Sequence, residues 1–244
     1  KKGMQNPLTV VILAAGLGTR LRPLTNDRPK ALVEVGGHTL LEITLRRLAS
    51  FGIREVIINV HHFADMIIDF LKKNDNFGMR IGISREEILL DTGGGLKKAG
   101  WFFQHDSEPF VLHNVDVIST TDLRRMVQFH EQNQALASLA VQDRKTSRRL
   151  LFDRQGQFHG RQQAEVPPGM VALAFGGIHV ISPRFLQLLC EKGGFSIINS
   201  YLRLAEQGER ILAFRADDYY WRDLGKPENV IQAESDAQSG ILPI

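Results

Sequence analysis

The segment L-A-A-G-L-G-T-R-L-R-P-L-T-N-D-R-P-K, residues 13–30, decides how this sequence is organised. An apolar run over 8–15 enters the segment and predicts a buried strand, and a second apolar run over 31–35 follows it. A connection this long is uncommon in a compact domain unless it serves a functional site. Gly16 and Gly18 let a ligand approach the backbone, and exposed N–H groups beside basic side chains form a natural phosphate cradle. Those basic side chains are Arg20, Arg22, Arg28 and Lys30.

Two common phosphate-binding loops do not fit this segment. A P-loop requires lysine followed by serine or threonine at a fixed spacing, and no such pair follows Gly18 in that spacing. A dinucleotide-binding loop requires a third glycine at the position of Leu21, which argues against a Rossmann-type oxidoreductase. An ordinary surface loop with scattered charge is the alternative, so the remaining sequence must decide.

The composition is that of a soluble globular protein. Of the 244 residues, 43% are hydrophobic and 23% are charged, with a net charge of only +3, so we expect no nucleic-acid partner. The basic cluster Arg144, Lys145, Arg148 and Arg149 is interpreted as a solvated loop. No apolar run reaches the length of a membrane span, and the N-terminal K-K-G-M-Q-N-P predicts no secretory signal.

The single cysteine, Cys190, excludes a disulfide framework and fits a cytoplasmic protein. Because Cys190 ends an apolar run over 185–190, we predict that it is a small core residue.

Strand and helix patterns alternate along the first half of the chain, which predicts an α/β fold. The fold expected is Rossmann-like, with a mostly parallel central sheet, helices on both faces and a small β-rich substrate lobe. Residues 1–244 then form one domain, with the lobe around 143–180. The predicted strands are 8–15, 55–60, 80–84, 109–113, 136–141, a hairpin from 150, 170–181, and a final pair over 211–215 and 219–222. The predicted helices begin after Thr39 and at Asp65, Asp122, Ser182, Ser196 and Pro227.

Two further segments could contribute to a site. The strand over 109–113 ends in Asn114-Val115-Asp116, and a carboxylate there could hold Mg²⁺, although a turn or helix cap is an equal alternative. The segment L-D-T-G-G-G-L-K-K-A, residues 90–99, places three glycines before a predicted helix and permits another close backbone approach.

At this point the sequence resembles the sugar-1-phosphate nucleotidyltransferases. Residues 16–30 match every fixed position of the signature G-x-G-T-R-x-x-P-x-T-x-x-x-P-K. N-V-D-V at 114–117 resembles the N-G-D-V metal segment, and W-R-D-L-G-K-P-E at 221–228 resembles W-x-D-x-G-T-P-E. The resemblance covers nearly the whole chain and implies the nucleotide-diphospho-sugar transferase fold.

The resemblance also implies a reaction, in which an NTP and a sugar 1-phosphate give an NDP-sugar and pyrophosphate, with Mg²⁺ as cofactor. By this resemblance, Arg20 stabilises pyrophosphate and Lys30 lies near the α-phosphate and the sugar phosphate. The remaining roles are nucleotide binding by Leu13, Ala14, Ala15, Gly16, Gly18 and Thr19, base contact by Thr92 and Gly93, sugar binding by Asn114 and Gly177, and metal binding by Asp116 and Asp223.

The chain departs from the family pattern at three places. Val115 replaces a glycine beside Asp116, Lys226 replaces a threonine, and residues 145–152 lack the expected Gly-Asp or Gly-Glu acceptor pattern. The glycine-rich segment, the spacing between motifs and the short length resemble uridylyltransferases acting on N-acetylmuramate 1-phosphate most, and guanylyltransferases acting on mannose or heptose 1-phosphate almost as much. Val115 and the altered acceptor segment leave a non-catalytic, sugar-nucleotide-sensing subunit as a further alternative. We expect a monomer or small homo-oligomer in cell-wall or polysaccharide precursor synthesis.

Overall fold

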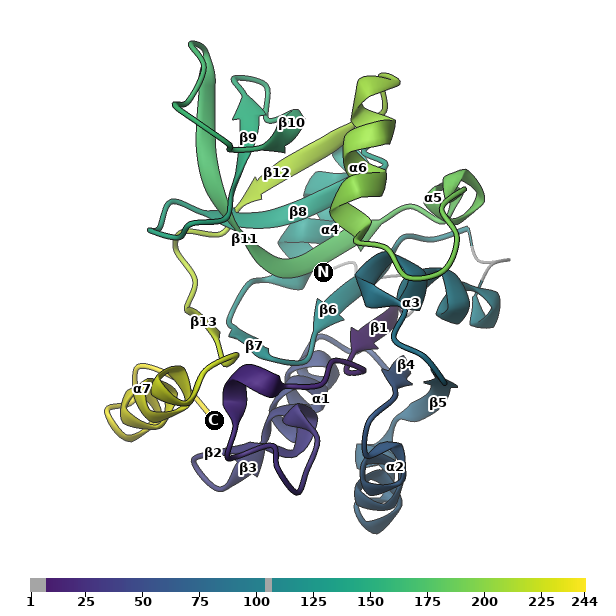
Figure 1. The fold of residues 1–244 in the computed structure, drawn as a ribbon, viewed down its shortest axis with the longest axis vertical. Coiled ribbons are helices and arrows are strands. Elements are labelled where there is room, and N and C mark those ends of the chain that lie inside the picture. The colour runs from purple at the N-terminus through teal and green to yellow at the C-terminus, as the bar shows by residue number, and fades with distance from the viewer. Residues whose placement is uncertain (1–7, 104–106) are drawn as a thin grey trace. The chain divides into compact units, whose positions relative to one another are not determined.

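The chain forms two compact structural units, and each unit is made of segments that are separated in sequence. The computed structural model describes residues 8–103 and 107–244 (Figure 1), so the N-terminal segment for which we predicted no secretory signal lies outside the described residues. Of the described residues, the first unit comprises 8–89, 113–120 and 220–244, and the second comprises 90–103, 107–112 and 121–219. Strand β6 (Phe110–Asn114) contains the boundary at residues 112 and 113.

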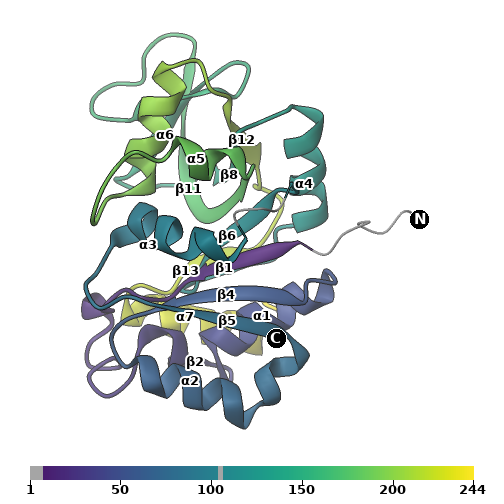
Figure 2. The ribbon, with the colours of Figure 1, turned by 90° about the vertical axis from the view of Figure 1, so that its right-hand side faces the viewer.

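The first unit is built on three parallel strands. These are β1 (Thr9–Leu13), β4 (Glu55–Val60) and β5 (Arg80–Arg85), with Thr9 opposite Glu55 and Glu55 opposite Arg80. Helices α1 (Leu40–Ser50) and α2 (Ala64–Lys73) connect them and lie on the same side of the three strands (Figure 2). All five residues of β1 are buried, as expected of a strand covered on both faces.

Helix α1 begins where the sequence predicted. The Thr39 side chain accepts a hydrogen bond from the Glu42 N–H at 3.0 Å, which satisfies one of the donors that the first helical turn leaves without a partner. Leu40, Leu41 and Leu45 then face the interior and are fully buried.

Short elements complete the first unit. Strands β2 and β3 form a hairpin, β7 and β13 form an antiparallel ribbon, and 3-10 helices flank the segment 22–29. Their bounds are β2 (Glu34–Val35), β3 (His38–Thr39), β7 (Val117–Ser119), β13 (Trp221–Asp223), 3-10 helices Thr19–Leu21, Lys30–Leu32 and Asp75–Gly78, and α7 (Pro227–Gln238).

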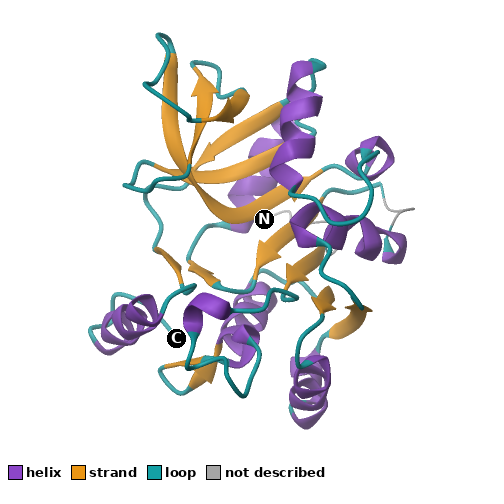
Figure 3. Cartoon of the chain, in the orientation of Figure 1, coloured by secondary structure: helices purple, strands orange, loops and turns teal. Residues whose placement is uncertain are grey.

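The second unit contains a mixed group of strands with helices packed on it (Figure 3). Strand β11 pairs antiparallel with β8 and β9, β10 pairs antiparallel with β9, and β12 pairs parallel with β8. The strands are β8 (Ala137–Gln142), β9 (Arg149–Asp153), β10 (Phe158–Arg161), β11 (Met170–Ile181) and β12 (Ile211–Arg215). The helices are α3 (Asp91–Ala99), 3-10 helix Gly100–Phe102, α4 (Leu123–Gln132), α5 (Arg184–Leu188) and α6 (Ile197–Glu206).

The predicted α/β class, with a mostly parallel central sheet flanked by helices, is confirmed, but several local predictions are wrong. The strands at 211–215 and 221–223 do not pair with each other, because β12 joins β8 and β13 joins β7. Cys190 is exposed rather than part of the core. Helix α5 ends at Leu188 and the extended residue Leu189 takes the buried position.

Two other interpretations also change. The glycines at 93–95 lie inside α3 rather than before it, and all three are buried. The basic cluster is only partly a solvated loop: Lys145 and Arg148 are exposed, whereas Arg149 lies in β9 and Arg144 donates to the Phe175 carbonyl at 3.2 Å.

Candidate active site

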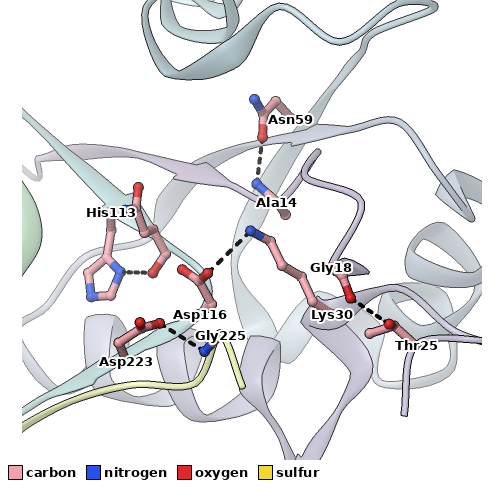
Figure 4. Close-up of polar contacts among 10 residues, drawn as sticks. Ala14, Gly18, Thr25, Lys30, Asn59, His113, Asp116, Asp223 and Gly225 are labelled. Atoms are coloured by element: carbon pink, nitrogen blue, oxygen red, sulfur yellow. Dashed lines mark hydrogen bonds and ion pairs between the residues drawn. The ribbon is translucent and has the colours of Figure 1, made fainter. Parts of the chain in front are cut away.

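The segment after β1 is anchored to the first unit rather than being a loose surface loop. Leu21 is fully buried and packs in a core cluster that includes Leu224 and Val230. The buried Thr25 hydroxyl donates to the Gly18 carbonyl at 2.6 Å and folds the segment back on itself (Figure 4). Gly18 has a φ of 65°, a left-handed conformation that glycine adopts without strain. The turn therefore has a defined shape.

The two predicted metal aspartates come together through the β7–β13 ribbon. Asp223 is paired with Val117, and the Leu224 N–H donates to the Asp116 carbonyl at 2.7 Å. Asp116 and Asp223 are therefore adjacent although more than a hundred residues separate them in sequence (Figure 4).

The other end of the ribbon is also closed by hydrogen bonds. Thr120 N–H donates to the Tyr220 carbonyl at 3.0 Å, and Tyr220 N–H donates to the Thr120 hydroxyl at 2.8 Å. The backbone that carries the two aspartates is thus held by hydrogen bonds at both ends of the ribbon.

Lys30, the last residue of the signature segment 16–30, extends its side chain to Asp116. Its ammonium Nζ lies 3.3 Å from Asp116 Oδ2, and both side chains are only 17% exposed, so water screens this pair incompletely (Figure 4). Gly16 makes room for the lysine, because a Cβ there would lie 2.8 Å from Nζ. Arg20 lies nearby, since a Cβ at Gly225 would meet its guanidinium at 3.0 Å.

The charges at this point favour a cation between the aspartates. Burial raises the pKa of the Asp223 carboxyl, and repulsion from Asp116 raises it further, whereas the Gly225 N–H, Arg20 and Lys30 oppose the shift. Two neighbouring carboxylates suit Mg²⁺, because this ion prefers oxygen ligands and is commonly held by one or two carboxylates plus substrate phosphates. Within residues 8–103 and 107–244, no group of three or more His, Cys, Asp or Glu residues could hold a metal ion.

His113 and Asn114 occupy the end of β6. The His113 Nδ1 donates to the Asn114 carbonyl at 2.7 Å, and burial lowers the pKa of His113 to about 4. His113 is therefore neutral at physiological pH and adds no positive charge to the site.

The departures from the family pattern have different structural effects. Val115 is fully buried, and its backbone is outside the left-handed region that would require glycine. Its N–H donates to the Leu13 carbonyl at 3.1 Å, so valine fits without backbone strain. Lys226 is the exposed N-cap of α7 and provides no side-chain cap, which a threonine at that position could supply.

Three predicted ligand residues belong to the second unit. The Thr92 hydroxyl accepts from the Ile197 N–H at 2.9 Å, and the Gly93 N–H donates to the Phe195 carbonyl at 2.9 Å. The close backbone approach expected at the glycine run is thus made, at least in part, by this chain's own residues. Gly177 has a φ of 76° and lies where the register of β11 against β8 shifts. The predicted ligand roles of Thr92, Gly93 and Gly177 stay predictions.

The sequence did not single out Asn59 and Glu86, which lie beside the predicted nucleotide-binding residues 13–19. Asn59 Oδ1 accepts from the Ala14 N–H at 2.6 Å, and Asn59 Nδ2 donates to Glu86 Oε2 at 2.7 Å (Figure 4 shows Asn59 and Ala14). The signal available was an asparagine inside the buried run of β4, where polar residues of low strand propensity are uncommon.

Comparison with known proteins decides the family. The nucleotidyl transferase family model matches residues 9–240, nearly all of the chain. The chain belongs to this nucleotidyl transferase family.

Relatives of this nucleotidyl transferase include proteins with different named substrates. It is 32% identical to N-acetylmuramate alpha-1-phosphate uridylyltransferase of Caulobacter vibrioides, over 95% of this chain and 97% of that protein. It is 28% identical to mannose-1-phosphate guanylyltransferase of Mycobacterium tuberculosis, and covers 65% of that longer protein. The structure of a putative glucose-1-phosphate thymidylyltransferase from Bacillus anthracis has a TM-score of 0.81 at 18% identity, covering 95% of both chains, which supports the fold.

These comparisons confirm the family that the sequence predicted from the signature at 16–30. In the first unit the structure brings Lys30 to Asp116, Asp223 beside Asp116, and Arg20 beside Gly225. The roles of individual site residues stay predictions.

Proposed function

We propose that this nucleotidyl transferase joins a nucleoside monophosphate from an NTP to a sugar 1-phosphate. An oxygen of the sugar phosphate attacks the α-phosphorus, the bond from that phosphorus to the β-phosphate oxygen breaks, and pyrophosphate leaves with the bonding electron pair. Reactions of this kind depend on positioning and charge neutralisation more than on covalent chemistry by the protein. The observation that carries the proposal is the meeting of Lys30, Asp116 and Asp223 at the signature segment.

Each charged group has a separate task in this proposal. Lys30 leaves Asp116 and holds the α-phosphate and the incoming sugar phosphate, and Arg20 neutralises charge on the departing pyrophosphate. Asp116 and Asp223 would hold Mg²⁺, which supplies charge neutralisation on the phosphate oxygens when it is bound. Backbone of residues 13–19 would line the nucleotide, with Thr92 and Gly93 at the base and Asn114 and Gly177 at the sugar.

We infer that UTP and N-acetylmuramate 1-phosphate, or a related hexose 1-phosphate, are the first pair to test. The support is the uridylyltransferase relative of nearly equal length at 32% identity. GTP with mannose or heptose 1-phosphate is the alternative, supported by the guanylyltransferase relatives at lower identity. The products would feed cell-wall or polysaccharide synthesis in the cytoplasm, by a monomer or small homo-oligomer. In the described part of the chain, no helix has the length and apolar character to cross a membrane.

The decisive experiment is a matrix of the four NTPs against a panel of sugar 1-phosphates, read by pyrophosphate release in the presence of Mg²⁺. Turnover with at least one pair is expected. Nucleotide binding without turnover across the whole matrix would instead support a sensing subunit.

Asp116→Asn and Asp223→Asn test the carboxylates. Both variants retain an oxygen that can accept the present hydrogen bonds from Lys30 and the Gly225 N–H, so we expect folding to persist. Turnover should fall by at least about 100-fold, the scale for losing one strong transition-state interaction. Asp69→Asn is the matched control, because Asp69 is exposed on α2, outside every predicted site segment, and should leave turnover unchanged. Full activity in either site variant would refute the metal assignment.

A further inference from the structure

A buried asparagine and a buried glutamate lie behind the predicted nucleotide segment. Asn59 is in β4 and Glu86 directly follows β5, and each is only 2% exposed. Burying a carboxylate is costly unless hydrogen bonds compensate it. Because both side chains are buried in the first unit, their polar groups need hydrogen-bond partners there.

The hydrogen bonds fix which way the Asn59 amide faces. A backbone N–H can only donate a hydrogen bond, so the Ala14 N–H at 2.6 Å requires the Asn59 amide oxygen to face it. The Asn59 NH₂ group must then face the opposite way, where it donates to Glu86 Oε2 at 2.7 Å. A flipped amide would place its NH₂ group against another N–H and its oxygen against a carboxylate, and both contacts would be repulsive.

The Glu86 backbone is itself held in place. Its N–H donates to the Val60 carbonyl at 2.8 Å, and its carbonyl accepts from His61 Nδ1 at 2.7 Å. The hydrogen bonds therefore form a series: the Ala14 N–H donates to Asn59, and Asn59 donates to the side chain of Glu86, whose backbone N–H and carbonyl are both hydrogen-bonded.

We propose that Glu86 and Asn59 are positioning residues for nucleotide binding, acting through the Ala14 N–H. Their contact sets the backbone at the end of β1, from which residues 14–19 continue toward Lys30 and Asp116. It also occupies the Ala14 N–H, so a nucleotide can use only the carbonyl and methyl group of that residue. This inference rests on the proposed function, because Ala14 enters the site only through it.

Reversing the polarity of the pair tests the inference. Asn59→Asp places a second carboxylate against Glu86 and removes the donor between them. Adding Glu86→Gln restores a donor, because the new amide can donate to the new carboxylate, which still accepts from the Ala14 N–H. Glu86→Gln alone retains an acceptor for Asn59 and is expected to be mild. Asn74→Asp, at the exposed end of α2, is the control for the same substitution elsewhere.

Three measurements separate positioning from a merely structural role: the Kd of UTP and of GTP with Mg²⁺ by calorimetry, the steady-state KM of each substrate, and urea unfolding. For N59D we expect the Kd and KM of the nucleotide to rise at least tenfold, with the KM of the sugar phosphate unchanged. N59D/E86Q and E86Q should both bind nucleotide within about threefold of the wild type. N74D should match the wild type in nucleotide Kd and in KM, whereas its urea unfolding should show a small loss of stability, because the Asn74 donor to the Phe70 carbonyl is removed.

Other outcomes overturn the inference. Nucleotide binding by N59D that equals wild type, or a double variant that binds no better than N59D, shows that the pair does not position the nucleotide. If N59D does not fold, the double variant still decides, because failure of both to fold and bind contradicts the restored polarity. A wild-type chain that binds no NTP refutes the proposed function itself and removes this inference with it. Loss of stability in N59D with normal nucleotide binding identifies a purely structural contact.

Discussion

Gly16→Ala should reduce activity while leaving the fold intact. A Cβ at this position would lie 2.8 Å from Lys30 Nζ and 3.2 Å from Lys30 Cε. Optimal contact needs about 3.5 Å, so the ammonium must retreat by roughly 0.7 Å or more from its present place. The ammonium is now 3.3 Å from Asp116 Oδ2, and a retreat of this size displaces it from the proposed phosphate position.

The expected loss in kcat/KM is roughly 10- to 100-fold, because misplacement of a reacting group by about 1 Å can cost on the order of 100-fold. Stability should change by less than about 1 kcal/mol, since the displaced atoms are the flexible end of a partly exposed ion pair. The backbone at Gly16 is outside the left-handed region, so alanine adds no strain there.

Gly37→Ala is the matched control with the opposite pattern. Gly37 has open space around its would-be Cβ but a φ of +82°, so alanine should cost about 1–2 kcal/mol of stability. Gly37 lies in the β2–β3 turn, and turnover should be unchanged at temperatures where the variant is folded. Pyrophosphate release and urea unfolding on both variants are the assays. Wild-type kcat/KM in G16A, or a stability loss in G16A as large as that in G37A, would refute the reasoning.

Further predictions concern stability. Lys226→Thr should stabilise the protein by about 0.5–1.5 kcal/mol in urea unfolding, because it supplies the missing N-cap of α7 and removes a positive charge from that helix end; an unchanged midpoint would contradict this. Gly94→Ala should destabilise by about 1–3 kcal/mol, although alanine is the better helix former, because its Cβ would lie 2.5 Å from the Gly193 carbonyl oxygen. Burial lowers the pKa of His130 to about 4, below the 6.5 of the unfolded chain, so the unfolded state takes up the proton first as pH falls. The His130 contribution is therefore complete above pH 6.5 and declines by up to about 1.4 kcal/mol per pH unit toward pH 4, and unfolding titrations of the wild type and His130→Gln should differ in that slope. Cys190 is exposed and should react with a thiol reagent in the native protein, at a rate unaffected by subdenaturing urea.

Local sequence patterns predicted helices and strands well where an apolar run was bounded by residues that begin or end such an element. The expected strands at 55–60 and 170–181 coincide with β4 and β11. The helix start expected after Thr39 is present, and Thr39 caps it, because its side-chain oxygen and the N–H three residues later lie within one turn. Such signals depend on neighbours in sequence, and they need no knowledge of the remaining fold.

Pairing between distant segments could not be predicted in the same way. The adjacency of 211–215 and 221–223 suggested a strand pair, but each strand takes its partner from elsewhere in the chain. The pattern of apolar residues says that a strand is present, whereas its partner depends on long-range packing. Asp116 and Asp223 were connected only by the family resemblance, since nothing local indicates the β7–β13 ribbon.

The buried polar residues Asn59 and Glu86 are the main features of the site that the sequence did not predict. Asn59 was hidden in an apolar run, and Glu86 stands beside Glu87 in a segment where nothing distinguishes the two. Only the fold shows that Glu86 is buried against Asn59. Local sequence carries little information about such hydrogen bonds, because whether a buried polar side chain is satisfied depends on a residue that is distant in sequence.

The hydrogen-bonded closure of the ribbon at Thr120 and Tyr220 has an evolutionary consequence. Residues 121–219 leave the first unit at one member of this pair and return at the other, so this excursion begins and ends at the same place. Insertions, deletions or wholesale replacement within the excursion can therefore occur without moving the two aspartates. The gene segment that encodes residues 121–219 is thus free to diverge separately, and chimaeras joined at 120 and 220 should keep Asp116 and Asp223 side by side.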